Sequence, residues 1–416
     1  MKKAIYKLNG IDIIMINTNK FKNTYFNIIF SGKYDEKNIC KRNLLIDMII
    51  NSCKKYNSNK LLNNKLNELY STNISSNYTK QYELSQTSFF VNCVNEKYIK
   101  ENNFYQKVVE IIYEIIYNPR IENNLFNEDV FNECKDNLEN KIRSLYDSKS
   151  SYSIIKLLEN MAPEEVISKS SLGTLNELET LTLKDISDEY QRLLSENLSI
   201  YIVGEFDENK ILNYFGNYFT DAKDIKGTNL CPLNFVENKK FIIEKQEITQ
   251  SKLLIGYRIN EEFNLKNYLI SLIFNYIFGG SYSSVLTTKI RKDNSFAYSI
   301  YSNMVLQYKL MYINMGIDKV NYKKILRLVE EELLKLKDGF IAEELIHNAK
   351  KMMISEVRNM QDSLGAIMGS AIFYYLYGFS IEDKTNINVI ESININDLEE
   401  FANKIVFDTV FLLEAI

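Results

Sequence analysis

The feature that most constrains the fold of this chain is a recurrence of its first half in its second. A shift of 224 residues places LLIDMIIN, which begins at Leu44, over YLISLIFN, which begins at Tyr268. The same shift, without a gap, places Ser71 over Ser295 and QTSFFVNCVNEKY over LMYINMGIDKVNY. Because the apolar rhythm matches over roughly fifty residues, we expect a duplicated domain of strands and helices, with about 200 residues in each copy.

Each half begins with strand patterns and continues with helical patterns. Asn9-Gly10 lies between two apolar runs and indicates a hairpin, because a type I′ turn needs positive φ at its central residues. The other strands expected in the first half are 25–30, 71–76, 87–94 and 198–203, and the helical segments are 39–53, 60–70, 98–117 and 125–160. The second half repeats this order, with strands at 241–247 and 252–260, two helices, two strands and then long helices.

The stretch between the halves has the composition of a connecting segment. It holds Gly227, Cys231, Pro232 and several polar residues. We therefore expect an N-terminal domain at 1–220, a linker at 221–238 and a C-terminal domain at 239–416.

Charge and hydropathy narrow the range of partners. The net charge is −4 and no basic block occurs, so we expect no nucleic-acid partner. The N-terminal apolar run is interrupted at Asn9, Asp12 and Asn17 before it reaches the length of a signal peptide, and no run of 18 apolar residues occurs. We expect a cytoplasmic protein with no membrane partner, in which the five cysteines are reduced thiols: Cys40, Cys53, Cys93, Cys134 and Cys231.

The chain contains one histidine, His347. A catalytic zinc site usually takes three protein ligands, most often including two or three histidines, so this chain by itself cannot build a two-histidine site. A Ser-His-Asp triad is excluded for the same reason, unless His347 belongs to it. His347 lies among Glu343, Glu344 and Asn348 on a predicted helix, and we expect it to be an exposed surface residue.

The most distinctive motif of the second half is FGGSYSSVLTTKIRKDNSFAYSIYS, which begins at Phe278. Gly279-Gly280 predicts a helix end in the left-handed region, which glycine enters freely. Ser281 is then expected to cap the next helix. Further along, Arg291 and Tyr298 are seven residues apart.

This motif resembles the second-domain signature of the pitrilysin/insulinase metallopeptidases, close to their bacterial and mitochondrial-processing-peptidase branch. Segments that begin at Thr18, Lys41, Leu66 and Lys135 are similar to a zinc-less bacterial subfamily whose best-known Bacillus member is associated with aminopentanol modification of elongation factor P. The resemblance implies an α+β fold of two homologous domains, each a mostly antiparallel sheet covered by helices. The signature residues fall on Gly279, Gly280, Ser284, Leu286, Arg291, Tyr298 and Ser302.

The resemblance also locates the place of the family's inverted zinc motif, His-x-x-Glu-His. The motif is expected on the first helix, where Asn43 and Asp47 replace the two histidines and Ile46 replaces the glutamate that activates water. Ile46 cannot accept a proton, and a lone Asp cannot hold the ion. The third ancestral ligand is expected near Glu133, Glu139 or Asn140, a choice that the sequence leaves open, and we interpret the acidic stretch around them as a solvated helix face.

In the family, the pair that corresponds to Arg291 and Tyr298 grips the substrate backbone. Such a role suits the chemistry, because a guanidinium can donate two parallel hydrogen bonds to a carbonyl or carboxylate and a phenol can add a third. The alternative is structural, with Arg291 capping a helix end and Tyr298 filling the core.

Two functions are compatible with these residues. The chain is expected to be a catalytically inactive, substrate-binding subunit of a heterodimeric zinc peptidase, whose homologous partner supplies the zinc while this chain supplies Arg291, Tyr298 and an edge strand for the peptide. Alternatively, it is a non-enzymatic scaffold that binds a peptide or protein, for example in elongation factor P modification.

Overall fold

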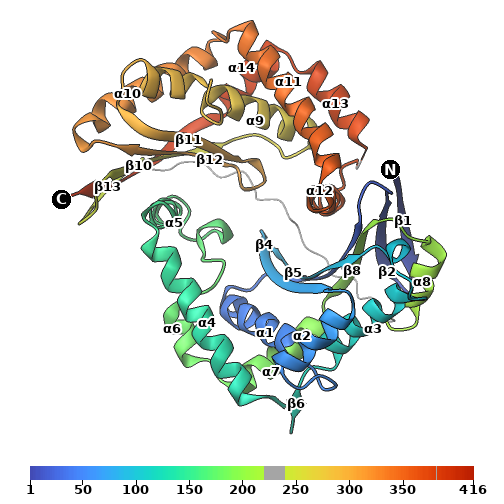
Figure 1. Cartoon of the computed structure of the whole chain (residues 1–416). Coiled ribbons are helices and arrows are strands. Elements are labelled where there is room, and N and C mark those ends of the chain that lie inside the picture. Colours follow the sequence, from blue (N-terminus) through green and yellow to red (C-terminus); the bar gives the residue numbers. More distant parts are fainter. Residues whose placement is uncertain (220–238, 381) are drawn as a thin grey trace. The chain divides into compact units, whose positions relative to one another are not determined.

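The structure is a computed structural model that describes residues 1–219, 239–380 and 382–416. It divides into two compact units, each assembled from three stretches of the chain (Figure 1). Of the described residues, the first unit contains 1–144, 170–219 and 360–380, and the second contains 145–169, 239–359 and 382–416. The linker expected at residues 221–238 lies outside the described residues.

The first unit is built on a six-stranded sheet. Its β2–β8 pair is parallel and the other neighbouring pairs are antiparallel. Asn9 and Gly10 have φ values of 52° and 85°, which confirms the predicted hairpin between the first two strands. The strand order is β1 (Lys2–Leu8), β2 (Ile11–Asn17), β8 (Asn197–Gly204), β3 (Asn23–Lys33), β5 (Leu84–Val94) and β4 (Asn73–Gln81).

The helices of the first unit begin and end close to the predicted positions, with two differences. The helix predicted from residue 98 begins at Phe104, after a short 3-10 turn. The helical segment 125–160 is divided at Ser148, whose hydroxyl accepts from the Ser151 N–H and caps the following helix. The helices and a small strand pair are α1 (Ile39–Asn51), α2 (Asn59–Glu68), α3 (Phe104–Tyr117), β6 (Ile121–Glu122), β7 (Leu125–Phe126), α4 (Glu128–Asp147), α6 (Leu175–Thr180), α7 (Leu183–Leu194) and α8 (Glu208–Gly216).

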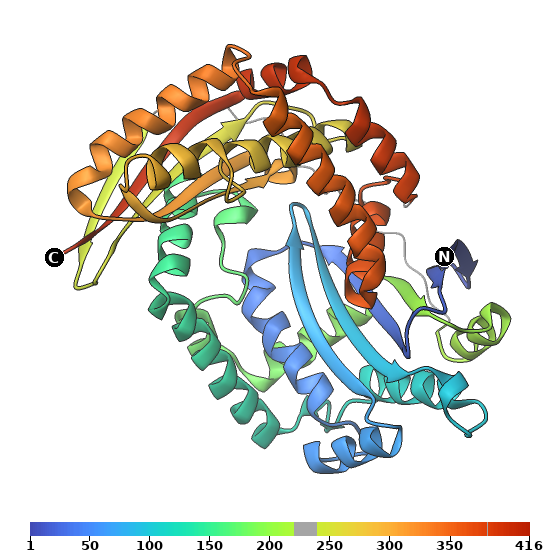
Figure 2. The same ribbon diagram turned by 45° about the horizontal axis from the view of Figure 1, so that its top comes forward.

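The second unit is built on a five-stranded sheet, and Figure 2 shows its helices lying along it. The strand order is β11 (Ala297–Val305), β12 (Leu310–Ile317), β10 (Ser251–Ile259), β13 (Ile405–Ala415) and β9 (Lys240–Gln246), and the β13–β9 pair is parallel. A π-helical turn, Thr287–Lys292, stands where a second regular helix was expected. The helices are α5 (Lys149–Met161), α9 (Leu265–Phe278), α10 (Tyr322–Lys337), α11 (Glu343–Asn359), α13 (Asp383–Ser392) and α14 (Ile395–Asn403).

The two sheets repeat one topology, as the internal recurrence predicts. Starting from the parallel pair of each sheet, the order β2-β8-β3-β5-β4 corresponds to β9-β13-β10-β12-β11, and β1 is an additional edge strand of the first sheet. The agreement extends to single residues, because Ser71 and Ser295, which the 224-residue shift superimposes, both adopt positive φ, at 55° and 56°. The expected fold class, an α+β fold with two homologous, mostly antiparallel sheets covered by helices, is confirmed.

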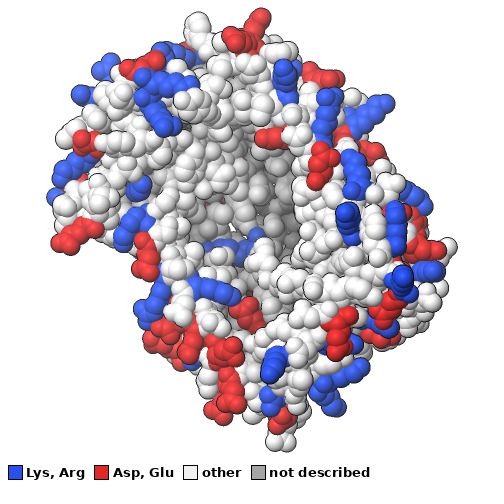
Figure 3. Space-filling view, in the orientation of Figure 1, with Lys and Arg blue, Asp and Glu red and all other residues white. Residues whose placement is uncertain are grey.

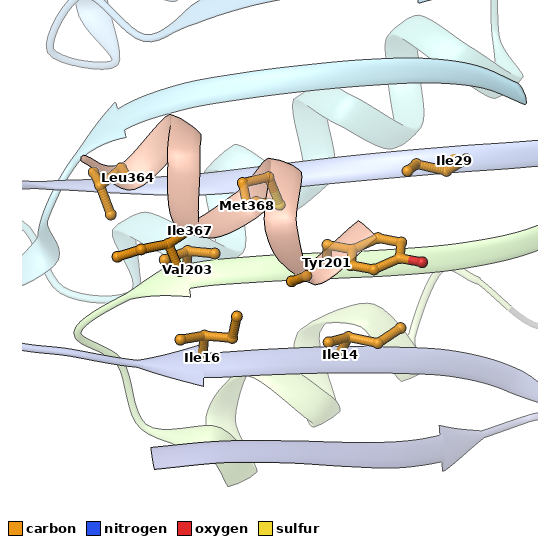
Figure 4. Packing of buried hydrophobic residues seen from close by; sticks show 9 residues of the cluster. Ile14, Ile16, Ile29, Tyr201, Val203, Leu364, Ile367 and Met368 are labelled. Atoms are coloured by element: carbon orange, nitrogen blue, oxygen red, sulfur yellow. The ribbon is translucent and has the colours of Figure 1, made fainter. Parts of the chain in front are cut away.

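Each sheet is covered on one face by a helix from the other half of the sequence. On the first sheet this helix is α12 (Leu364–Leu376), whose Ile367 and Met368 pack against Ile14, Ile16 and Val203 (Figure 4). Burial on both faces explains why β8 is apolar almost throughout.

On the second sheet the corresponding cover is α5, which packs on β10 and β13. Gly256 permits this approach, because a Cβ atom there would lie 2.7 Å from the sulfur of Met161. Arg258 of β10 then donates to the Met161 carbonyl oxygen at 2.9 Å and pairs with Glu165 at 2.7 Å and Asp408 at 3.1 Å. A buried ionic cluster thus fastens α5 and the turn after it to the sheet.

Candidate functional site

The residues at the zinc-motif positions serve the packing of the first unit. They lie on α1, and the side chain of Asn43 is buried. Its Nδ2 donates to the carbonyl oxygens of Ile39 and Ser171, both at 2.9 Å, which joins the helix to the loop before α6. Ile46 is buried in the core, where a glutamate would have no water to activate.

The carboxylate of Asp47 faces α4. It accepts a hydrogen bond from the Lys141 ammonium at 2.7 Å. The buried thiol of Cys134 lies in the same region, and burial, together with the negative charges of Asp47 and Glu133, raises its pKa to about 12. The raised pKa makes the thiolate, which is the nucleophilic and metal-binding form, scarce at neutral pH.

The three residues considered for the third ligand position lie in different surroundings. Glu133 is exposed. Its negative charge, like that of Asp47, raises the pKa of the Cys134 thiol. Glu139 pairs with Arg143 along the same helix at 2.7 Å, and Asn140 is exposed. Across residues 1–219, 239–380 and 382–416, no three His, Cys, Asp or Glu side chains are placed to hold a metal ion.

The residues present at these positions do not fit zinc. The amide of Asn43 is engaged by two carbonyl oxygens, Ile46 offers no lone pair, and Lys141 places a positive charge against the one carboxylate. Zinc sites are built from imidazole, thiolate and carboxylate ligands, and these positions supply one carboxylate alone.

In the second-half motif, the glycines allow two segments to approach closely. A Cβ atom on Gly279 would lie 2.8 Å from Ser302 Oγ, and one on Gly280 would lie 2.6 Å from Asn275 Nδ2. Ser302 Oγ in turn donates to Asn275 Oδ1 at 2.6 Å. The predicted left-handed helix end is wrong, because Gly279 has φ −150° and Gly280 has no positive φ; close packing, rather than backbone conformation, requires these glycines.

The turn after the glycines is capped by a different serine from the one predicted. The Ser284 hydroxyl accepts from the Thr287 N–H at 3.3 Å, whereas Ser281 contributes only its carbonyl oxygen, which accepts from Thr287 Oγ1. Leu286 is fully buried. Five of the seven signature residues, Gly279, Gly280, Ser284, Leu286 and Ser302, are therefore accounted for by local packing.

Arg291 and Tyr298 are the two signature residues that local packing does not account for. Arg291 is exposed on the π-helical turn, and among the described residues no carboxylate pairs with it. Tyr298 is 66 % exposed, and its hydroxyl has no hydrogen-bond partner within the described part of the chain. Both lie at backbone irregularities, since the ladder between β11 and β12 shifts between Ala297 and Ser299 and leaves Tyr298 at a bulge. π-turns and β-bulges are frequent at functional sites, where they redirect a side chain.

The surroundings of this pair are basic and aromatic. Tyr282, which is 72 % exposed, lies under the Lys292 ammonium at 4.2 Å and near the Arg291 guanidinium at 6.0 Å. Tyr298 belongs to β11, an edge strand, so one side of this strand has no neighbouring strand in the sheet. Sequence reasoning missed Tyr282 and Lys292, although SYSS and IRKD in the motif hinted at an aromatic and basic cluster.

Surface charge elsewhere is mixed. On the face shown in Figure 3, Lys and Arg side chains alternate with Asp and Glu, without a continuous field of one sign. His347 is exposed on α11, as predicted. Within the described residues, every helix is too short or too polar to cross a membrane.

The chain is similar to known proteins in sequence and in structure. Residues 180–353 match the family described as "Peptidase M16 inactive domain". The chain is 25 % identical over 418 residues to the "Probable inactive metalloprotease YmfF" of Bacillus subtilis, a match that covers 98 % of this chain and 96 % of that protein. A conserved protein from Enterococcus faecalis superimposes with a TM-score of 0.93 at 23 % identity over 100 % of this chain and 99 % of its own. A protease from Helicobacter pylori gives a TM-score of 0.78 at 16 % identity, with 99 % of both chains covered.

Proposed function

This chain is an inactive homologue of the M16 metallopeptidases, the pitrilysin/insulinase family, and from that premise we propose that it is the substrate-binding subunit of a two-chain peptidase. A homologous partner would carry the His-x-x-Glu-His motif and supply the zinc and the activated water. This chain would hold the peptide with Arg291 and Tyr298.

The observation that carries the proposal is the unequal use of the signature residues. Side chains that stabilise a fold normally have partners within it, because an unpaired polar group loses its hydrogen bonds on burial and gains nothing when exposed. Arg291 and Tyr298 have no such partners among the described residues and project from irregular backbone. A carbonyl or carboxylate of a bound peptide would supply the missing acceptor.

The edge strand β11 offers a second source of affinity. An extended peptide can add to a free sheet edge and form main-chain hydrogen bonds of low sequence specificity. Tyr298 is located at the start of β11, directly after the turn that carries Arg291. A peptide added along β11 would therefore run past both side chains.

The first unit supports the division of labour between two chains. Asn43, Ile46 and Asp47 all have structural roles at the motif positions, so these three residues offer nothing with which to activate water. Cleavage would require the partner, and we expect neither zinc nor turnover from this chain alone.

The proposal is tested by co-expressing the chain with a homologue that carries His-x-x-Glu-His, most simply one encoded by a neighbouring gene. We expect zinc-dependent cleavage of short peptides by the purified pair. Arg291→Ala should lower kcat/KM by roughly 10- to 100-fold, because a charge-assisted hydrogen bond contributes about 1.5–3 kcal/mol, and Tyr298→Phe should lower it less. The matched control is Arg327→Ala, which removes another exposed arginine, one that pairs only with Glu331 on its own helix.

Two results would count against the proposal. An unchanged kcat/KM for Arg291→Ala in an active pair would show that this arginine does not contact substrate. A pair that binds peptides through Arg291 but never cleaves them would favour the scaffold alternative.

A further inference from the structure

The second unit contains a cavity of about 460 Å³ between α10 and the sheet formed by β9, β13 and β10. Its walls include the buried side chains of Ile255, Leu333 and Val410. Ligand cavities are typically about 300–1,000 Å³ and mostly apolar, with a few polar groups that fix orientation. This cavity therefore has the size and the lining of a small-molecule site.

The equivalent region of the first unit is filled, which shows that the cavity is not a requirement of the fold. The strand ladders place Ile255 and Tyr257 where Ile28 and Phe30 stand in the first sheet, because their partners across the ladder differ by the same 224 residues. In the first unit, aromatic rings occupy the space over this face. Phe30 lies 6.5 Å from Tyr117 of α3, and Tyr117 lies 5.6 Å from Phe219, which follows α8.

Two polar groups at the cavity have hydrogen-bonding capacity left for a ligand. Tyr257 is only 3 % exposed and lines the cavity, yet its hydroxyl has no hydrogen-bond partner among the described residues. Lys337 also lines it, and its ammonium donates to the Ile405 carbonyl oxygen at 2.7 Å. An ammonium has three donors, so two remain available. Burial lowers the pKa of Lys337, so an anion beside it would stabilise its charged form.

The charged residues that line the cavity are Lys239, Lys337 and Glu330, which leaves one net positive charge. Glu330 is exposed, whereas Lys337 is partly buried. An anionic head group is therefore favoured over a cationic one. The hydroxyl of Tyr257 can donate to the same head group.

We infer that this cavity binds a small amphiphilic anion of the medium-chain carboxylate class. The hydrocarbon chain would lie among Ile255, Leu333 and Val410, and the carboxylate would accept hydrogen bonds from the Lys337 ammonium and the Tyr257 hydroxyl. This site is separate from Arg291 and Tyr298 and does not depend on the peptidase proposal.

The test is isothermal titration calorimetry of the full chain with sodium decanoate, kept below its micelle concentration. We expect saturable binding at one site. Lys337→Met should weaken binding at least tenfold and Tyr257→Phe about threefold, whereas Lys323→Met, which removes an exposed lysine from the same helix, should leave it unchanged. Decylamine, which has the same chain and the opposite charge, should bind at least tenfold more weakly than decanoate.

A variant that fills the cavity locates the site independently of charge. Leu333→Phe should abolish decanoate binding while circular dichroism and Tm show a folded protein. Absence of saturable decanoate binding to the wild type, equal affinity for decylamine and decanoate, or unchanged binding by a folded Leu333→Phe protein would each overturn the inference.

Discussion

The two units share one strand order. They differ in whether the polar side chains of the candidate site positions have partners within the unit. In the first unit, Asn43 is bonded to two carbonyl oxygens and Asp47 is neutralised by Lys141. In the second unit, Arg291 and Tyr298 project to solvent without described partners. A polar side chain that has a partner inside its unit contributes to folding, and one that has none is available for a ligand. On the proposed function, the comparison separates helix positions that serve folding from a turn and a strand whose side chains are available to a peptide.

Both units also contain a buried arginine cluster. Removing one of these arginines is expected to cause the largest loss in the free energy of unfolding. Arg42 of α1 is fully buried and bonds to Glu196 in two places, to Glu189 and to Thr87. Arg42→Ala would leave the buried carboxylates of Glu189 and Glu196 with Arg192 as their remaining cation, at 3.1 Å and 4.0 Å. This loss should reduce the free energy of unfolding by about 3–5 kcal/mol.

The matching change in the second unit should cost less. Arg258→Ala also removes a cation from two carboxylates, but Glu165 is 17 % exposed, so water can solvate it, and Asp408 still accepts from the Thr409 hydroxyl at 2.6 Å. We expect a loss of about 2–3 kcal/mol, measured by urea unfolding, with Arg327→Ala as the surface control. Equal losses for Arg42→Ala and Arg258→Ala would contradict this ranking.

The next largest effect tests whether Asn43 has become structural. Asn43→Ala removes both hydrogen bonds and leaves the Ser171 carbonyl oxygen without this donor. The free energy of unfolding should fall by about 1–3 kcal/mol. Asn43→His is the informative companion, because an ancestral-type histidine should also destabilise the protein if the two carbonyl contacts matter. An unchanged free energy of unfolding in Asn43→Ala would mean that the Asn43 side chain does not contribute to folding.

Alkaline pH should destabilise the first unit through its thiols. Burial first, and then nearby carboxylates, raises the pKa of Cys40 and of Cys134 to about 12. In the unfolded chain these thiols lose their protons near pH 8.5, whereas in the folded chain they keep them. The unfolded state therefore binds fewer protons, and stability falls as pH rises from about 8.5 to 12.

The expected loss is about 2 kcal/mol for each thiol by pH 10. It should be smaller in Cys134→Ala when unfolding is compared at pH 7 and pH 10. The same slope in the wild type and in Cys134→Ala would show that the thiol titrates normally.

The smallest expected change in stability is that of the Arg291 and Tyr298 variants, in contrast to the Asn43 variant. Arg291→Ala and Tyr298→Phe should each change the free energy of unfolding by less than about 0.5 kcal/mol, because neither side chain has a hydrogen bond or ion pair to lose among the described residues and the contact of Arg291 with Tyr282 is exposed. Thermal unfolding of the isolated chain measures this directly. A loss above about 1 kcal/mol for either variant would place that residue among the structural ones.

Much of this architecture follows from local sequence signals. The Asn9-Gly10 turn, the apolar strand at β8 and the 224-residue recurrence predict the hairpin, a strand buried on both faces and the duplicated sheets, because turn chemistry and side-chain alternation are local properties. The start of α3 and the π-helical turn at Arg291 were not predictable, since tertiary contacts decide where a helix begins and how it distorts.

The candidate site shows the same division. Arg291, Tyr298 and the replaced motif positions could be named from the motifs of the sequence. The partners of Asn43 and Asp47 could not, because Ser171 and Lys141 are far away in the sequence and only folding brings them close. The glycine pair was correctly predicted to mark a helix end, but the predicted reason was wrong. Glycine is needed there because Ser302 and Asn275 lie close, and not because φ is positive.

The crossing of α5 and α12 to the opposite sheets has a consequence for how the protein can be divided. Cutting the polypeptide between residues 219 and 239 would give two fragments, each missing the helix that covers one face of its own sheet and each carrying a stray apolar helix. Neither fragment is a self-sufficient module, despite the symmetry of their sequences. The two copies have become mutually dependent since their duplication, and they would regain solubility only when mixed.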